Sequence, residues 1–389
     1  MASLKQALTT FRSKTAFPAG NILLLAFALL ALLAAMWAGL LRLDLDLPWL
    51  QAGLALSHGP LMVCGFLGTL IGLERSVALN RWWAYDAPGL TALGTFSLIA
   101  GVPGIPAPLL ISMGSLALVW NLGIIVRRQT ALFTATIAFA ALAWLIGNVL
   151  WLCQAPIASM VNWWAGFLVL TIVGERLELS RFVSYSGRSK GLFVGSAIIF
   201  AAGLVWASLD RFTGLEIAGV GLILLSLWLF RFDVARRTVY QQGLPRFIAV
   251  SLLSGYFWLG VGGLLWCRAP VLGDPKLQSF YYDAMLHSIF LGFVFSMIFA
   301  HAPIIFPAIT GKALPYRKAL YVHVLLLHLS VLVRIASDLQ GRFVAYRWSG
   351  ISNVMAIVVF LLNTAYGTAF GRQKSNQFPK GSGAELIPR

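Results

Sequence analysis

The sequence predicts an all-α polytopic membrane protein with twelve transmembrane helices, and three observations support this prediction. Hydrophobic residues make up 59% of the 389 residues, and charged residues only 11%. Runs of about 20 apolar residues, the length that an α-helix needs to cross a bilayer, recur along the whole chain. The connections between these runs are short and often contain Pro or Gly, as at residues 102–106. Because lipid offers backbone groups no partner, each run is expected to be a helix.

Taken in order, the apolar runs predict twelve separate spans. Short connections favour helices that pack beside their neighbours in sequence. No connection is long enough to form a domain, so we expect residues 1–380 to be a single transmembrane domain. Residues 381–389 resemble an artificial linker. The spans are expected near residues 20–42, 48–73, 87–103, 106–126, 131–153, 157–174, 191–209, 214–231, 247–266, 284–308, 318–336 and 346–370.

The charge distribution predicts the topology. A formal net charge of +16 would suit a nucleic-acid partner, but the basic residues concentrate in the N-terminal segment, alternate loops and the C-terminal tail. The positive-inside rule then places both termini in the cytoplasm. We therefore expect a multi-pass protein of a bacterial inner membrane, whose partner is the lipid bilayer rather than nucleic acid.

A weak internal repeat relates three of the spans. The sequence Gly-Phe-Leu at residues 65–67, followed by Glu-Arg at 74–75, recurs in the sixth span at 166–168 and 175–176. The tenth span has Gly-Phe at 292–293. Equivalent features in spans 2, 6 and 10 predict a four-helix unit used three times, in pseudo-threefold arcs. Chance similarity among apolar helices is the alternative. We expect the Glu-Arg pairs to form structural ion pairs rather than a proton path.

All five histidines of the chain fall inside predicted spans. A single intramembrane histidine is more often a hydrogen-bonded packing residue than a ligand. Because no loop histidine exists here, the placement of all five indicates binding, since an unused imidazole in a membrane is costly. The five are His58, His287, His301, His323 and His328.

Depth along the helices separates the histidines into two groups. His58 and His287 lie in the outer parts of spans 2 and 10, whereas His301 lies about 21 Å further along its helix. We therefore expect His58 and His287 to bind one haem. His301, His323 and His328 would form a second, deeper site. His323 and His328 are about 140° apart around one helix, so His301 would pair with only one of them.

The two haem-binding segments resemble those of a known family. Residues 58–62 read His-Gly-Pro-Leu-Met and precede Phe66, and His287 is followed by Phe-Pro at 306–307 and Thr-Gly at 310–311. These motifs resemble the low-spin haem segments of subunit I of the haem-copper oxidases and of its offshoot, the NnrS proteins. The resemblance implies a subunit I-like fold of twelve helices in three arcs, cytoplasmic termini and a haem b held by His58 and His287.

The sequence also departs from that family. Met285 stands where the family has the histidine that binds the oxygen-reducing haem. Span 6 carries no histidine where the oxidases have copper ligands, and span 7 offers no strong ligand. We therefore do not expect an oxidase of the known type. The span 6 residues at this place are Ser159, Asn162, Trp163 and Trp164.

Arginines between spans 11 and 12 are candidates for binding the haem propionates. This region offers Arg334, Arg342 and Arg347, and the resemblance implies that propionate-binding arginines lie here. Guanidinium groups suit carboxylates because they donate in a planar fork. Arg334 and Arg342 are our candidates for contact with the cofactor. Ordinary solvated loop arginines are the alternative.

These features predict a haem b protein similar to NnrS, with a role in the response to nitric oxide or nitrosative stress. The deeper histidines would hold copper or a second haem. One alternative is a membrane oxidoreductase that takes electrons from quinol. Another is a twelve-helix secondary transporter, although transporters tend to have inverted repeats and helices broken at the midplane. The sequence does not decide whether the protein is an enzyme.

Overall fold

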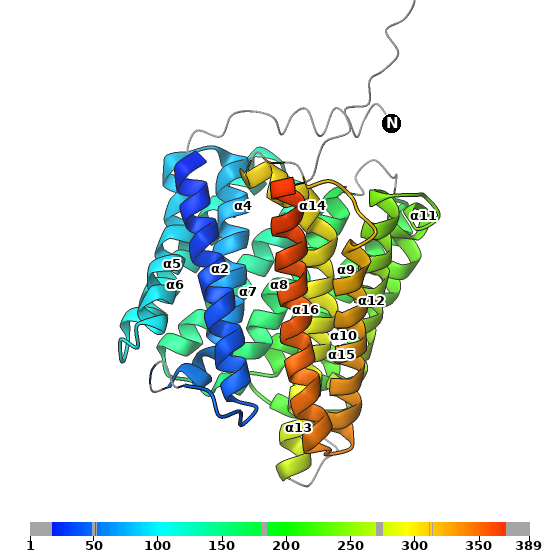
Figure 1. Cartoon of the computed structure of the whole chain (residues 1–389). Coiled ribbons are helices and arrows are strands. Elements are labelled where there is room, and N and C mark those ends of the chain that lie inside the picture. Colours follow the sequence, from blue (N-terminus) through cyan, green and yellow to red (C-terminus); the bar gives the residue numbers. More distant parts are fainter. Residues whose placement is uncertain are drawn as a thin grey trace, which may run out of the picture.

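The structure is a computed structural model that describes residues 18–48, 51, 53–179, 185–269, 275–310, 312 and 314–370. The described residues are mainly helical and contain no strand. Figure 1 shows the long helices side by side in one bundle. The predicted linker at 381–389 lies outside the described residues.

The long helices follow one another along the chain with short connections. They are α2 (Pro18–Leu41), α4 (Thr69–Leu79), α5 (Asp86–Ile99), α6 (Pro106–Arg128), α7 (Leu132–Leu152), α8 (Ile157–Leu179), α9 (Gly187–Trp206), α10 (Arg211–Phe232), α12 (Leu244–Arg268), α13 (Pro275–His287), α14 (Ser296–Thr310), α15 (Leu320–Leu339) and α16 (Phe343–Phe370).

Short helical pieces complete some of these spans. The piece η1 (Leu54–Ser57) is a 3₁₀-helix before α3 (His58–Pro60), and η3 (Trp82–Tyr85) is a 3₁₀-helix before α5. The pieces η2 (Leu61–Gly68) and η5 (Ser288–Phe295) are π-helices inside two of the long spans. Between α10 and α12 lies the short helix α11 (Ala235–Thr238).

Eleven helical stretches of the described chain are long and apolar enough to cross a membrane, so the chain is a multi-pass membrane protein. The predicted third span, at 87–103, corresponds to α5, which has only 14 residues. At 1.5 Å per residue, α5 is about 21 Å long, which is shorter than the hydrocarbon core of a bilayer. The count of twelve spans and the threefold arcs remain predictions.

The helix ends follow from local sequence. Proline at the first position of α6 has no N–H group to leave unpaired there. The side chain of Asp210 caps α10 by accepting from the N–H of Phe212 at 3.1 Å. Asn80 ends α4 in the left-handed conformation, with φ of 51°. Gly243 has φ of 73° directly before α12, a conformation that a side chain would disfavour.

Helix α8 is the most enclosed span of the bundle. Of its most apolar 18 residues, 83% are buried inside the protein, against 33% for α9 and α16. Large side chains such as Trp164 and Phe167 fill the space around it, and Phe167 stacks on Trp144 of α7 with ring centres 4.8 Å apart. A helix that is apolar all round suits such a central position.

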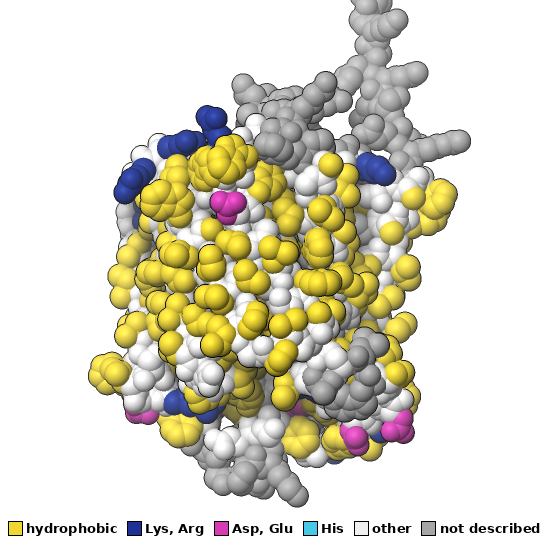
Figure 2. All heavy atoms as spheres, turned by 90° about the vertical axis from the view of Figure 1, so that its left-hand side faces the viewer, with side chains coloured by type: hydrophobic (Ala, Val, Ile, Leu, Met, Phe, Trp, Pro, Cys, Tyr) yellow, Lys and Arg dark blue, Asp and Glu magenta, His cyan; other side chains and the backbone are white. Residues whose placement is uncertain are grey.

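The two ends of the bundle differ in charge. Helix α2 begins and α16 ends at the same end of the bundle, which we call the terminal end; the other is the opposite end (Figure 1). In Figure 2 a broad apolar band separates two polar rims, and Lys and Arg side chains gather on the rim at the terminal end. Such a band between polar rims is the surface that a bilayer requires.

Candidate functional site

His58 is held by helix α2 near the opposite end of the bundle. Its Nδ1 lies 2.8 Å from the carbonyl oxygen of Ala35, so this nitrogen carries the proton and donates. Gly39, one turn further along α2, lies against the imidazole: a Cβ at this position would be 2.9 Å from Cε1 of His58. The absence of a side chain at Gly39 therefore makes room for the ring.

His287 ends α13 and is oriented by a residue one turn before it. Its Nδ1 lies 2.9 Å from the carbonyl oxygen of Asp283 and 3.1 Å from Oδ2 of the same residue. Both acceptors favour a proton on Nδ1, which leaves the lone pair of a neutral imidazole on Nε2. His287 and His58 thus have the same tautomer and the same free nitrogen.

The two imidazoles face each other across the bundle. Their ring centres are 6.4 Å apart and their planes are inclined by 24°. That separation is well beyond the contact distance of about 3.5–4.0 Å between carbon atoms. Two imidazoles bound to one metal ion by nitrogen bonds of about 2.0–2.1 Å would have ring centres about 6.2–6.4 Å apart. The observed distance between the ring centres lies in this range.

The second ring nitrogen of each histidine has no partner within the described protein. Neither Nε2 has a hydrogen-bond partner in the described part of the chain, and neither belongs to the fully buried polar atoms without partners. Metal-binding histidines almost always donate through the other ring nitrogen to a carbonyl or carboxylate. Both histidines satisfy this condition. The residues present therefore fit a haem iron with two imidazole ligands.

A π-helix follows each of these histidines. The segment η2 begins three residues after His58, and η5 begins directly after His287, and each has eight residues. π-helical segments are rare and occur frequently at functional sites. Eight residues beyond each histidine, about two helical turns, Phe66 of η2 faces Phe295 of η5, with ring centres 6.3 Å apart. The spans that carry η2 and η5 thus face each other with a pair of rings at two depths, first the two histidines and then the two phenylalanines.

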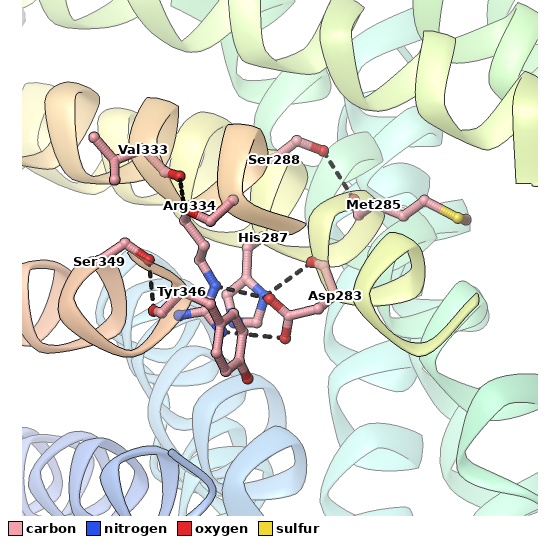
Figure 3. Close-up of polar contacts among 9 residues, drawn as sticks. Asp283, Met285, His287, Ser288, Val333, Arg334, Tyr346 and Ser349 are labelled. Carbon is pink, nitrogen blue, oxygen red and sulfur yellow. Dashed lines mark hydrogen bonds and ion pairs between the residues drawn. The ribbon is translucent and has the colours of Figure 1, made fainter. Parts of the chain in front are cut away.

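An ion pair lies beside His287, as Figure 3 shows. Arg334 of α15 donates to both carboxylate oxygens of Asp283, from Nε at 2.8 Å and from Nη2 at 3.1 Å. The ring of Tyr346 of α16 lies 4.8 Å from the guanidinium carbon. Arg334 is only 6% exposed. Its Nη1 has no hydrogen-bond partner among the described residues, so it can still donate to a ligand.

The arginines predicted between spans 11 and 12 lie in different places. Only Arg342 is in the connection between α15 and α16, where it is exposed. Arg347 lies within α16, and Arg334 lies in α15, buried against Asp283. The expectation of a loop position for Arg334 and Arg347 was wrong, because α15 extends to Leu339 and α16 begins at Phe343. Arg334 is nonetheless beside the histidine pair.

The region of span 6 is filled by packed aromatic rings. Trp164 donates from Nε1 to Oδ1 of Asn148 at 3.0 Å, and Trp144 donates to Sγ of Cys64 at 3.4 Å. Met285 is buried, with 3% of its surface exposed. No group of three or more His, Cys, Asp or Glu side chains in the described chain is arranged to hold a metal ion. The described residues at this place therefore form a packed core.

The comparisons with known proteins identify the family of the chain. The family model described as "Domain of unknown function (DUF8744)" matches residues 21–369. The chain belongs to this family. No curated protein and no solved structure matches it. The DUF8744 description states no activity, so a function has to be argued from the site.

The deeper histidines of this DUF8744 protein do not contact one another in the described structure. His323 packs with its ring edge-on to Phe299, at 4.7 Å between centres, and to Phe247 and Phe360. Nδ1 of His328 accepts from Nε1 of Trp258 at 2.9 Å. Nδ1 of His323 also lies 3.4 Å from Nδ2 of Asn363, so both histidines have polar or aromatic neighbours within the protein.

His301 has a different set of neighbours. Its Nδ1 lies 2.8 Å from the carbonyl oxygen of Met297, which leaves Nε2 as the free nitrogen. The charged groups that interact with it electrostatically are Arg176, Glu74 and Asp233, near the terminal end. His301 therefore belongs to the ionic groups of α4 and α8 rather than to α15.

The ionic groups near His301 include the two Glu-Arg sequences for which structural ion pairs were predicted. Arg75 contacts Glu175, so the two Glu-Arg sequences meet in space. Arg176 donates to both oxygens of Asp233 at 2.9 and 3.0 Å.

The sequence analysis missed two acidic residues that the structure makes important. Asp233 had no predicted role, and the only feature of the sequence that could have pointed to it is its position directly after a span. Asp283 was also missed, although its position four residues before His287 puts both on one helix face.

Proposed function

We propose that this protein binds haem b, which His58 and His287 would hold, and acts in the response to nitric oxide or nitrosative stress, as its resemblance to NnrS proteins implies. One observation carries the haem assignment. The ring centres of the two imidazoles are 6.4 Å apart, both Nδ1 atoms are hydrogen-bonded, and neither Nε2 atom has a partner in the described protein. This arrangement supports a bis-histidine site. A pair of packing histidines would fill its donors and acceptors with protein groups.

The surrounding residues would prepare the imidazoles for the iron. Ala35 and Asp283 fix the tautomers, and the Asp283 carboxylate makes His287 a stronger electron donor. Arg334 has a free Nη1 beside this pair, and it would bind a haem propionate. Arg42, which interacts electrostatically with His58, is a second cation for the same purpose. When bound, haem b would supply one-electron chemistry and an iron to which a diatomic gas can bind.

We further propose that the terminal end of the bundle faces the cytoplasm of a bacterium and that the haem site lies near the outer surface of the inner membrane. The Lys and Arg side chains on the terminal rim support this orientation. A twelve-helix arrangement in three arcs, with α5 as the short twelfth member, agrees with the parallel course of the two histidine spans. The span 6 residues around Trp164 offer no imidazole for an oxygen-reducing copper centre.

Absorption spectroscopy of the purified full-length protein tests the proposal. We expect a red protein whose oxidised and reduced spectra are those of low-spin haem b, and whose reduced spectrum changes when nitric oxide is added. His58→Ala and His287→Ala should each lose most of the haem, whereas His323→Ala should retain it. Full haem content in both of the first two variants would show that the ligands are elsewhere.

A further inference from the structure

A second acidic residue lies beside the ion pair of Arg334 and Asp283, which Figure 3 shows next to His287. Asp338 follows Arg334 by four residues on α15, so both lie on one face of that helix. Asp283 precedes His287 by four residues on α13 in the same way. The carboxyl group of Asp338 interacts electrostatically with Arg334 and is within hydrogen-bonding reach of Asp283. Two residues from each helix therefore form one polar cluster.

Asp338 is almost completely enclosed by protein. Only 1% of its surface is exposed, and both of its carboxyl oxygens are fully buried. Neither oxygen accepts a hydrogen bond from a donor in the described part of the chain. An ionised carboxylate that is buried without hydrogen bonds is strongly destabilising. The burial of Asp338 therefore favours the neutral, protonated form of this side chain.

The guanidinium of Arg334 does not supply the missing hydrogen bonds. Its Nε and Nη2 both donate to Asp283, at 2.8 and 3.1 Å. One positive charge thus stands beside two carboxyl groups, and two carboxylates within hydrogen-bonding reach repel each other strongly when both are ionised. Asp283 has the two hydrogen bonds from Arg334 and the contact with His287, so Asp283 is the ionised member. The proton of the pair belongs to Asp338.

Asp283 has a lone pair to accept the O–H group of Asp338. A carboxylate offers about four lone-pair positions. Oδ2 of Asp283 accepts from Arg334 and lies 3.1 Å from Nδ1 of His287. Among the described donors, Oδ1 accepts only from Arg334. A hydrogen bond from a neutral carboxyl group to a carboxylate is about twice as strong as one between neutral groups.

We propose that Asp338 is a neutral carboxylic acid that donates a hydrogen bond to Asp283, and that it acts through Asp283 as a positioning residue for His287. The hydrogen bond holds the carboxylate of Asp283 in place and draws electron density from it. Asp283 then pulls less strongly on the Nδ1 proton of His287, so Asp338 limits how strongly Nε2 can donate electrons. The proton on Asp338 does not depend on the haem, whereas its effect on an iron ligand rests on the proposed function.

Infrared spectroscopy of the full-length protein in nanodiscs tests for the proton on Asp338. A neutral carboxyl group and a carboxylate absorb at different frequencies, and the measurement does not require haem. At neutral pH we expect a carboxylic-acid C=O band that loses the intensity of one carboxyl group in Asp338→Asn. Asp86→Asn is the control, because Asp86 is exposed at the start of α5, and its band should match the wild type. An unchanged band in Asp338→Asn would overturn the proposal.

The midpoint potential of the bound haem tests the positioning role. Asp338→Asn keeps a neutral donor of similar size, so its potential should equal that of the wild type. Asp338→Leu removes the donor, so Asp283 pulls more strongly on His287 and the potential should shift to a lower value. A higher potential in Asp338→Asn would mean that a negative charge had been removed. That result, or a wild-type potential in Asp338→Leu, would overturn the role of Asp338.

Unfolding in dodecyl sulfate separates these effects from a loss of the fold. Asp338→Asn should unfold at the same dodecyl sulfate concentration as the wild type, since it removes no charge and keeps the hydrogen bond. Unfolding at a lower concentration would indicate that an ionised Asp338 had balanced the charge of Arg334, which contradicts a neutral acid.

The failure of this proposal and the failure of the haem assignment give different results. A protein that shows the infrared band of Asp338 but contains no haem would contradict the haem assignment alone. A protein that contains haem but lacks this band would contradict the proton on Asp338 alone.

Discussion

The buried Arg334 and the partly buried Asp283 form an ion pair that joins α15 to α13 and at the same time orients a histidine. The guanidinium donates to both oxygens of the carboxylate, and Oδ2 of this carboxylate lies 3.1 Å from Nδ1 of His287. Such a carboxylate has two tasks: it balances the charge of a buried arginine, and it fixes the tautomer of an imidazole. The two tasks give separate measurable consequences.

Asp283→Asn is expected to affect both stability and haem binding. The buried guanidinium would lose its counter-charge, and breaking such a pair from one side costs about 3 kcal/mol. The unfolding free energy in a dodecyl sulfate titration should fall by that amount. The haem should be bound more weakly, because the asparagine side chain offers His287 a weaker acceptor.

A double variant separates the two effects of Asp283. In Asp283→Asn with Arg334→Gln, no unpaired charge remains, so part of the stability should return. Haem affinity should stay low, since the carboxylate beside His287 is still missing. Equal recovery of stability and haem affinity would contradict the assignment of two tasks to Asp283.

Gly39→Ala is expected to displace the imidazole of His58. The new Cβ would lie 2.9 Å from Cε1 and 3.0 Å from Nδ1, closer than side-chain contacts allow. The haem content of the purified protein should fall severalfold while its helical content stays unchanged. Gly59→Ala is the matched control, because a Cβ there meets nothing within 4 Å. Equal haem content in the two variants would show that Gly39 does not determine the position of the ring.

Much of this arrangement could be predicted from the sequence. Helix period and rise placed His58 and His287 at one depth, and the structure brings their rings to 6.4 Å. The role of Asp283 was also accessible, since residues four apart share a helix face. The burial of Arg334 was not accessible, because a positive charge at the end of an apolar run looks the same whether it faces water or a carboxylate of another helix.

The π-helices and the short α5 were beyond sequence reasoning for a different reason. An apolar run does not reveal whether its backbone N–H groups donate to the carbonyl four residues earlier, as in an α-helix, or five residues earlier, as in a π-helix. That choice depends on packing between helices. Likewise, the run at 87–103 has the composition of a span, although α5 ends at Ile99. Local composition sets the existence of a helix, whereas neighbouring helices set its length and pitch.

His323→Phe is expected to leave the protein intact. His323 is surrounded by the rings of Phe247, Phe299 and Phe360, and a phenyl ring can occupy the same place. Stability should change by less than about 1.5 kcal/mol, as in other volume-conserving exchanges. Metal analysis should give the same iron content as the wild type. A loss of copper or iron in this variant would restore the second metal site predicted from the deeper histidines.

Asp233→Asn is expected to destabilise the bundle without changing the haem site. Arg176 is 6% exposed and Asp233 only 3%, and their two hydrogen bonds join α8 to the connection after α10. The asparagine would leave the buried guanidinium of Arg176 without its counter-charge, at a cost of about 3 kcal/mol. The side chain of Asp233 also accepts from the N–H of Ala235 at 2.7 Å, which an amide oxygen can still do. The unfolding free energy in dodecyl sulfate should therefore fall as much as in Asp283→Asn, but the haem affinity of the folded protein should equal that of the wild type.

The dodecyl sulfate titration of Asp233→Asn also decides whether the two sites are independent. Haem loss at the same dodecyl sulfate concentration as unfolding would agree with independence, whereas haem loss before unfolding would indicate that the pair of Arg176 and Asp233 acts on the pair of His58 and His287.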